Sequence, residues 1–158
     1  MISNQAGDRL YTQIKDRLTE AYDKIHTSGI TIDGDFTKSV ENKLKAITGR
    51  KNAKLMTSGT TSIMTALLAW DIIGKRVACV NYSFIASANQ ASLLNKVDFF
   101  DIDDKGIMLT DEEFDHDAVI PVSLYGNTID YDYIKIAKNT KLIVDCAQGI
   151  GSLYKGKP

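Results

Sequence analysis

The chain has 158 residues, 44% hydrophobic and 25% charged, a composition typical of a globular protein and not of a disordered or collagen-like chain. Its 19 Lys and Arg residues against 20 Asp and Glu residues give a formal net charge of -1, so no broad basic field is available to bind nucleic acid. No apolar run approaches the ~20 residues that a membrane helix needs, and two cysteines do not make a disulfide scaffold. We therefore expect a cytoplasmic protein whose partners include neither nucleic acid nor membrane.

Residues 1–50 are predicted to form an N-terminal helical arm. The hydrophobic residues between 8 and 26 recur at spacings of three and four, which places them on one face of a helix; they are Leu10, Ile14, Leu18, Tyr22 and Ile25. A second helix is predicted over residues 36–47, and Gly49 closes it.

From residue 51 the pattern changes to strands that alternate with helices. Strands are expected at residues 53–57, 76–80, 97–102, 118–124 and 142–144, and helices at 60–73, 84–95 and 130–138. Residues 103–117 are predicted to be an acidic loop with one helical turn near Asp111. This alternation indicates βαβ units. The predicted fold class is therefore α/β, a three-layer structure with a mostly parallel sheet flanked by helices, and residues 51–158 are expected to form one structural unit.

In such sheets, ligands bind at the carboxyl ends of the strands. The segment from Thr57 to Ser62 joins a predicted strand to a helix and offers a glycine and several hydroxyls. Backbone N–H groups at a helix N-terminus favour an anion such as phosphate. No lysine follows Gly59, so the nucleotide-binding Walker pattern is absent. A hydroxyl-capped helix without a ligand explains the same residues equally well.

Asp145 ends an apolar strand, where a carboxylate is costly unless it is paired. A protonated ring nitrogen of a cofactor is one suitable partner; a helix cap or a surface salt bridge are the alternatives. Phe84 follows another strand and could lie flat against a planar ring, or could belong to the core. Gln148 could hydrogen-bond in the same pocket or could simply be exposed.

Metal-binding motifs are not found in the sequence. His26 and His116 lie ninety residues apart, without acidic or thiol neighbours at ligand spacing. The acidic stretch from Asp101 to Asp117 lacks the ordered spacing of a calcium loop and is expected to be a solvated loop. We therefore expect no metal site.

Five blocks of sequence occur in a fixed order: KLMTSGTTSIMTALLA, VNYSFIASANQ, VDFFDID, VIPVSLYGNTIDYDYI and LIVDCAQGIGSLYKGK. Together they resemble the DegT/DnrJ/EryC1/StrS family of sugar aminotransferases, which are pyridoxal-phosphate enzymes of fold type I. The resemblance extends over about residues 26–158. It implies that residues 51–158 are an incomplete large domain that binds pyridoxal 5'-phosphate, and that the protein is a homodimer.

The resemblance also implies six cofactor-binding residues, which come from the ends of different segments: Gly59, Thr60, Thr61, Phe84, Asp145 and Gln148. The first three would hold the phosphate through amides and hydroxyls. The aromatic ring would stack on the pyridine ring, the carboxylate would pair with the ring nitrogen, and the glutamine would lie near the phenolic oxygen.

The family's Schiff-base lysine lies downstream of Pro158. The implied reaction is transfer of an amino group from an amino-acid donor to a nucleotide-linked keto sugar. We expect this chain to be truncated before the lysine, to hold no catalytic residue and to be inactive alone. Two alternatives remain: a sugar dehydratase of the same fold, and a non-catalytic remnant that serves as a binding or assembly module.

Overall fold

The computed structural model describes residues 7–109 and 113–158, and the chain divides into two compact units, Met1–Lys43 and Leu44–Pro158. The first unit holds α1 (Gly7–Ser28), and α2 (Asp35–Thr48) begins in it. Both helices were predicted within two residues of these bounds. Over residues 7–48 the structure buries no side chain of either helix. Across the described ranges, no helix is long and apolar enough to cross a membrane.

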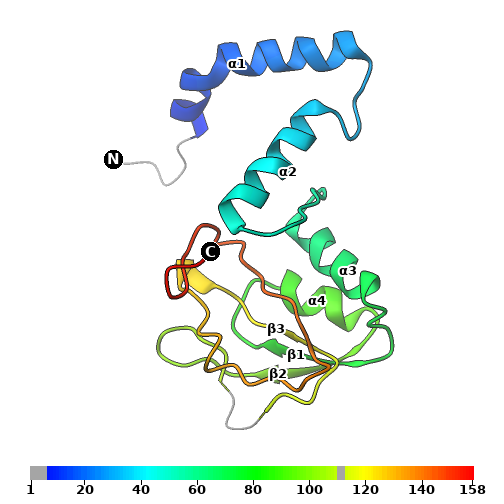
Figure 1. The fold of residues 1–158 in the computed structure, drawn as a ribbon, viewed down its shortest axis with the longest axis vertical. Helices are drawn as coiled ribbons and strands as arrows, with labels where there is room; N and C mark the ends of the chain where they lie inside the picture. The colour runs from blue at the N-terminus through cyan, green and yellow to red at the C-terminus, as the bar shows by residue number, and fades with distance from the viewer. Residues whose placement is uncertain (1–6, 110–112) are drawn as a thin grey trace. The chain divides into compact units, whose positions relative to one another are not determined.

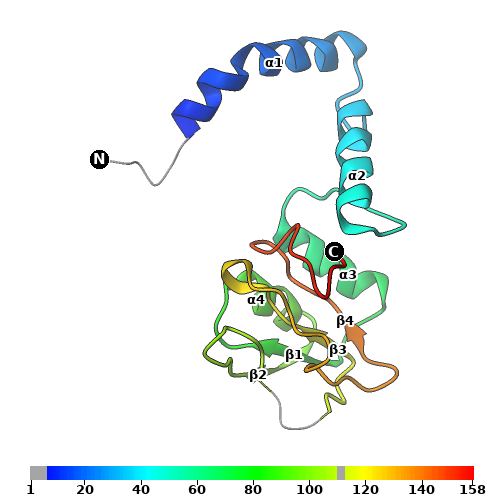
Figure 2. The same ribbon diagram turned by 60° about the vertical axis from the view of Figure 1, so that its left-hand side comes forward.

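The second unit is built on a four-stranded sheet in the order β2-β1-β3-β4, whose neighbouring strands all run parallel. Figure 1 labels the first three of these strands, and Figure 2 also labels β4. The strands are β1 (Arg76–Val80), β2 (Lys96–Phe100), β3 (Ala118–Ile120) and β4 (Lys141–Leu142). The helical elements of this unit, besides the end of α2, are α3 (Gly59–Ala69), α4 (Ala86–Ser92) and the 3-10 turn η1 (Leu124–Gly126). The α/β class and the parallel sheet are thus confirmed.

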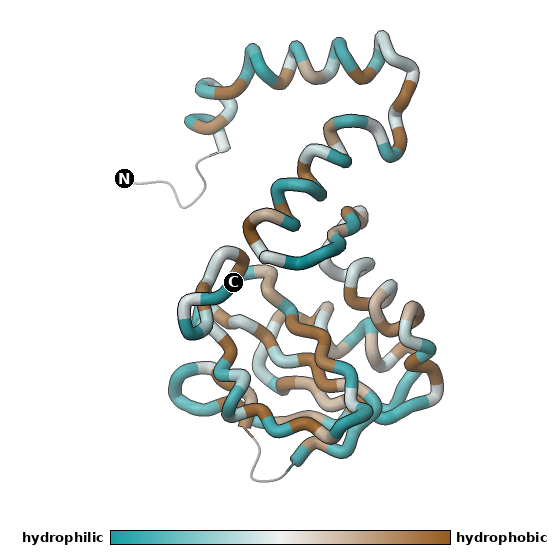
Figure 3. Tube along the Cα trace, in the orientation of Figure 1, coloured by the Kyte–Doolittle hydropathy of each residue, from teal (hydrophilic) through white to brown (hydrophobic). Residues whose placement is uncertain are grey.

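Both faces of the sheet are covered. Val77 and Cys79 of β1 pack with Ile63 and Leu67 of α3 and with Ala91 of α4. Successive strand residues point to opposite faces, so Ala78 and Val80 of β1 face the other side. They belong to the second core cluster, which also contains Met108, Phe114, Val119, Ile129 and Ile134. Helices therefore cover one face, as Figure 2 shows from a second side, and irregular segments cover the other. Figure 3 shows hydrophobic residues running through the strands between these layers.

Two predicted elements are wrong. Residues 53–57 join no strand of the sheet, although a strand was expected there. Residues 130–138 form turns in place of the expected helix. The amides of Ile134 and Asp132 donate to Asp130. The backbone groups that follow do not continue a helix but pair with Phe114: the Phe114 amide donates to Lys135 O, and the Ala137 amide donates to Phe114 O. Local apolar spacing does not reveal such a distant partner. The helical turn predicted near Asp111 lies outside the described residues.

A charged cluster holds the amino edge of the sheet. The guanidinium of Arg76 on β1 donates to Asp98 Oδ2 on β2 from Nε at 3.2 Å and from Nη2 at 3.1 Å. His116 Nε2 lies 3.2 Å from the same oxygen, and its ring, 6% exposed, packs edge-on against Phe100 and Phe114. The hydrogen bond from Arg76 holds the pKa of Asp98 below its usual value. The ionised Asp98 carboxylate therefore ties two neighbouring strands together.

We predict that Asp98→Asn lowers the free energy of unfolding at neutral pH. Because the folded-state pKa of Asp98 is depressed, its contribution is present above the unfolded pKa and is lost as the pH falls through the folded value. Denaturant unfolding at neutral pH and at about pH 3 checks this: the free energies of unfolding of the wild type and the variant should differ less at the acidic pH than at neutral pH. The control is Asp104→Asn in the exposed loop. A difference that grows in acid would contradict the prediction.

Candidate functional site

A crevice is expected where the connections of two adjacent strands leave over opposite faces of the sheet. The chain passes from β1 to β2 through α4, on the face that α3 also covers. It passes from β3 to β4 through residues 121–140, whose Ile129 and Ile134 pack on the opposite face. The switch point therefore lies between β1 and β3, at their carboxyl ends. The segments that follow these strands contain five of the loop residues considered below: Tyr82, Ser83, Phe84, Ser123 and Tyr125.

The N-terminus of α3 points toward this same edge. A short turn joins the end of α3 to the amino end of β1, and α3 packs against this strand. The chain therefore reverses direction between them. Because the helix and the strand are each about 16 Å long, Gly59 at the start of α3 lies toward the carboxyl end of β1. Ser58 caps the helix: its Oγ accepts the Thr61 amide at 3.1 Å. Helix geometry leaves the amides of Gly59 and Thr60 without an intrahelical acceptor. The Thr61 hydroxyl lies 3.1 Å from the hydroxyl of Thr57 and 3.0 Å from that of Ser58.

Asp145 follows β4 and is half-buried. Its Oδ2 accepts the hydroxyl of Ser87 at 2.7 Å, and its Oδ1 accepts the amide of Ala147 at 3.1 Å. Among residues 7–109 and 113–158, no lysine or arginine forms an ion pair with this carboxylate. Of the alternatives considered for Asp145, the surface salt bridge is therefore not formed within that part of the chain, whereas the capping contact is formed, because the carboxylate accepts the first amide of the turn at Ala147. The capped carboxylate still lacks a cationic partner.

The Phe84 segment is connected to Asp145 through Ser87. The backbone amide of Ser87 donates to Phe84 O at 3.2 Å while its hydroxyl donates to the carboxylate. The Phe84 side chain is 74% exposed, which excludes the core assignment considered for it. Ser87 thus connects the backbone of the segment that carries this exposed ring to a carboxylate that has no cationic partner in the described ranges. An aromatic face and a carboxylate are the two groups that suit a flat cationic ring.

Gln148 is tied to the loop after β3. Its Oε1 accepts the backbone amide of Tyr125 at 2.6 Å, which leaves its NH2 group to donate elsewhere. Tyr125 has a left-handed backbone, with φ of 54° and ψ of 21°, which costs a non-glycine residue roughly 1 kcal/mol. The hydroxyl of Tyr125 lies 3.1 Å from that of Tyr82. Gln148 thus supports a strained turn that places two tyrosines together across the switch point.

The turn after Asp145 approaches the turn after β3 very closely. A Cβ atom added to Gly149 would lie 2.5 Å from the Cβ atom of Ser123, a separation that no ordinary packing allows. Only glycine fits there. This contact sets the position of the loop that carries Asp145 and Gln148.

The buried cysteine in the strand that leads to the site is chemically quiet. Cys79 of β1 is buried, and burial, with a smaller effect from the charge of Asp145, raises the pKa of its thiol to about 12. The thiolate form, which is the nucleophile, is therefore scarce at neutral pH. The second cysteine, Cys146, follows Asp145 directly and is exposed.

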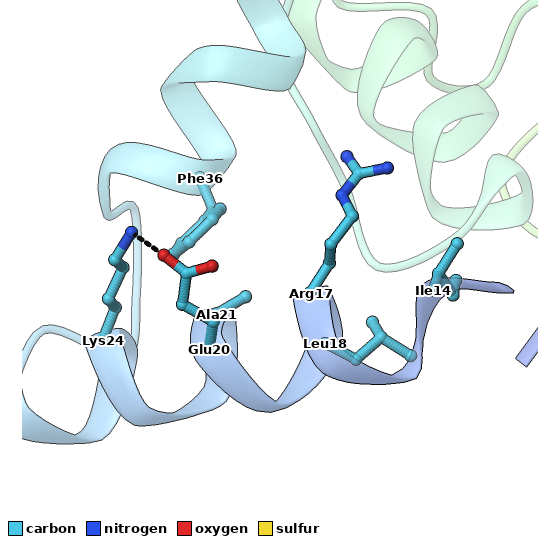
Figure 4. A pocket seen from close by; sticks show the side chains of 7 residues that line it. All are labelled: Ile14, Arg17, Leu18, Glu20, Ala21, Lys24 and Phe36. Atoms are coloured by element: carbon cyan, nitrogen blue, oxygen red, sulfur yellow. Dashed lines mark hydrogen bonds and ion pairs between the residues drawn. The ribbon is translucent and has the colours of Figure 1, made fainter. Parts of the chain in front are cut away.

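Small hollows open at this edge. One of about 230 Å³ is lined by residues that include Asn81, Ser83 and Phe84, and another of about 150 Å³ by residues that include Cys146 and Gly149. A hollow of about 350 Å³ lies in the helical unit, where Phe36 of α2 faces Glu20 and Lys24 of α1, which form an ion pair (Figure 4). None of the six candidate residues lines the helical hollow.

Phe84, Asp145 and Gln148 thus lie on segments that follow the strands at this edge; Ser87 connects Phe84 O to Asp145, and Gln148 accepts the Tyr125 amide. The turn from Gly59 to Thr61 is placed toward the same edge by the length of α3, and no hydrogen bond in the described ranges joins it to the other three candidates. Sequence reasoning missed Ser87, Tyr125 and the role of Gly149. Ser83 and Ser87 are four residues apart at the start of a predicted helix, a spacing that could have indicated two hydroxyls on one face.

Solved aminotransferases share this fold. A DegT DnrJ EryC1 StrS aminotransferase from Brucella abortus superposes with a TM-score of 0.80 at 22% sequence identity, and the match covers 96% of this chain and 45% of that one. The fold is therefore that of fold-type-I aminotransferases over part of their length.

The sequence comparison identifies the family. The chain belongs to the DegT/DnrJ/EryC1/StrS aminotransferase family, whose model matches residues 12–158. It is 34% identical over 155 residues to a UDP-4-amino-4,6-dideoxy-N-acetyl-beta-L-altrosamine transaminase of Campylobacter jejuni, covering 90% of this chain and 40% of that protein. It is 28% identical over 156 residues to a UDP-2-acetamido-2-deoxy-3-oxo-D-glucuronate aminotransferase of Pseudomonas aeruginosa, covering 92% of this chain and 44% of that protein. The chain spans less than half the length of these relatives.

We predict that Gly149→Ala destabilises the second unit. The added methyl group would overlap Ser123, and overpacking of this kind costs about 1–3 kcal/mol. Denaturant unfolding measures the loss. The matched control is Gly59→Ala, because a Cβ atom at Gly59 meets nothing within 4 Å, and its effect should stay under about 0.5 kcal/mol. Equal stability of the two variants would refute the close approach.

Proposed function

We propose that this chain contributes the cofactor-binding part of a nucleotide-sugar aminotransferase that uses pyridoxal 5'-phosphate. The observation that carries the proposal is the half-buried Asp145 carboxylate, held by two hydrogen bonds and facing no protein cation in the described ranges. Membership of the family and the printed activities of the Campylobacter and Pseudomonas relatives support the reaction class.

The residues at the carboxyl edge fit this cofactor. Asp145 offers an anion to a protonated ring nitrogen. The exposed ring of Phe84 offers a face for stacking, and the NH2 group of Gln148 offers a donor for the phenolic oxygen. The free amides at Gly59 and Thr60, with the Thr61 hydroxyl, offer donors for the phosphate. These roles for the six residues are part of the proposal.

When bound, pyridoxal phosphate supplies an electron sink for amino-group transfer. This chain's residues would bind and orient it: Asp145 keeps the ring nitrogen charged, and the α3 N-terminus anchors the phosphate. The donor would be an amino acid and the acceptor a nucleotide-linked keto sugar. The proposal further includes a cytoplasmic homodimer, with residues 1–50 as the helical arm and residues 51–158 as the cofactor-binding unit.

We predict that Asp145→Asn weakens binding of pyridoxal 5'-phosphate about tenfold, because a neutral amide replaces a charge-assisted contact. The dissociation constant is measured by following the cofactor's absorbance during titration of the full chain. Asp104→Asn makes the same change of charge in an exposed loop and should bind like the wild type. If Asp145→Asn folds and binds as tightly as the wild type, the ring-nitrogen assignment is wrong.

We also predict that residues 1–158 alone do not turn over. The family resemblance implies a Schiff-base lysine outside residues 1–158, so these residues by themselves do not supply the group that shuttles the proton. The test incubates the chain with pyridoxal 5'-phosphate, a mixture of the common amino acids and a UDP-linked keto sugar, and measures the 2-oxo acids and amino sugars formed. Heat-unfolded chain gives the background rate. Repeated turnover above that background would overturn the prediction.

A further inference from the structure

Ser87 is a buried hydroxyl with a specific partner far away in the sequence. The residue lies in α4 and is 0% exposed. Its Oγ lies 2.7 Å from Asp145 Oδ2, across 58 residues of chain. A buried hydroxyl is stabilised only by hydrogen bonding, and a bond of this length to a carboxylate is charge-assisted. The contact therefore does more than fill space.

The direction of the hydrogen bonds follows from the number of protons. An ionised carboxylate only accepts, so Ser87 donates its single hydroxyl proton to Asp145. Ser83 Oγ lies 3.3 Å from Ser87 Oγ; because the Ser87 proton is used, Ser83 is the donor of that pair. The two hydroxyls thus form a directed chain that ends on the carboxylate.

The carboxylate keeps room for a ligand. Each carboxylate oxygen has two lone-pair sites. Ser87 uses one on Oδ2 and the Ala147 amide uses one on Oδ1. Donors on both oxygens, one from each side of the switch point, restrict rotation of the carboxylate about its Cβ–Cγ bond and leave a lone pair on each oxygen.

We propose that Ser87 is a positioning residue, whose hydroxyl, supported by Ser83, fixes the Asp145 carboxylate in the orientation that pairs with the ring nitrogen of the cofactor. This inference rests on the proposed function, because it concerns the same ring-nitrogen contact. Ser87 does not touch the cofactor; it acts through Asp145. Since its amide also donates to Phe84 O, the same residue couples the stacking segment to the charged one.

The experiment compares two ligands on the full chain: pyridoxal 5'-phosphate, and its analogue in which a C–H group replaces the ring nitrogen. Ser87→Ala should weaken binding of pyridoxal 5'-phosphate about tenfold and change binding of the analogue by less than about twofold. Ser87→Cys keeps the side-chain volume with a weak donor and should show the same selective loss, which guards against a folding defect in the alanine variant.

Two further variants test whether Ser87 affects cofactor binding through Asp145. Ser92→Ala makes the same substitution at the exposed end of α4, where the hydroxyl donates to Asn89 O, and should leave both affinities unchanged. In an Asp145→Asn background, Ser87→Ala should cause no further loss, because a residue that acts through another has no effect once that residue is changed.

The outcomes separate the two proposals. A wild type that binds both ligands equally overturns the ring-nitrogen contact of the proposed function, and this inference with it. If the wild type prefers pyridoxal 5'-phosphate over the analogue and both Ser87→Ala and Ser87→Cys keep that preference, the positioning role of Ser87 is overturned while the ring-nitrogen contact stands. Equal losses for both ligands would mark Ser87 as merely structural and would also overturn it.

Discussion

The parallel pairing of β1 with both β2 and β3 is the constraint from which the site follows. A central strand with neighbours on both sides sends its own connection over one face, while the connection that follows β3 leaves over the other. The loops that follow β1 and β3 must then separate at the carboxyl ends of these two strands. Ser87 and Asp145 come from opposite sides of that separation, and their hydrogen bond joins the two branches of the chain where a ligand would enter.

Much of this arrangement could be predicted from the sequence. Continuous apolar runs such as the one in β1 indicated strands buried on both faces, and turn chemistry before α3 indicated its start within one residue. The failures have a common cause. Residues 130–138 carry a helical spacing, but their backbone pairs with Phe114, and a one-dimensional pattern does not contain that contact. Ser87 was missed for the same reason, since its partner is 58 residues away.

The proposed cofactor site is assembled from weak separate signals. A capped helix, an exposed aromatic ring and a strand-ending carboxylate are each common in proteins without ligands. Their placement on one edge, with the Asp145 carboxylate held by Ser87 and Ala147 and not by a protein cation in the described ranges, makes them a coherent set. The close approach of Gly149 to Ser123 fixes the position of the loop that carries Asp145 and Gln148 relative to the loop that follows β3.

The charged cluster of Arg76, Asp98 and His116 occupies the opposite end of the same strands. Its partly exposed ion pair is weakened by dissolved salt, whereas the part-buried hydrogen bond between the neutral Ser87 hydroxyl and Asp145 is screened less. The two ends of the sheet are therefore governed by different solution variables. Raised ionic strength should therefore weaken the contact between β1 and β2 at their amino ends more than it weakens the contact between Ser87 and Asp145 at the carboxyl ends.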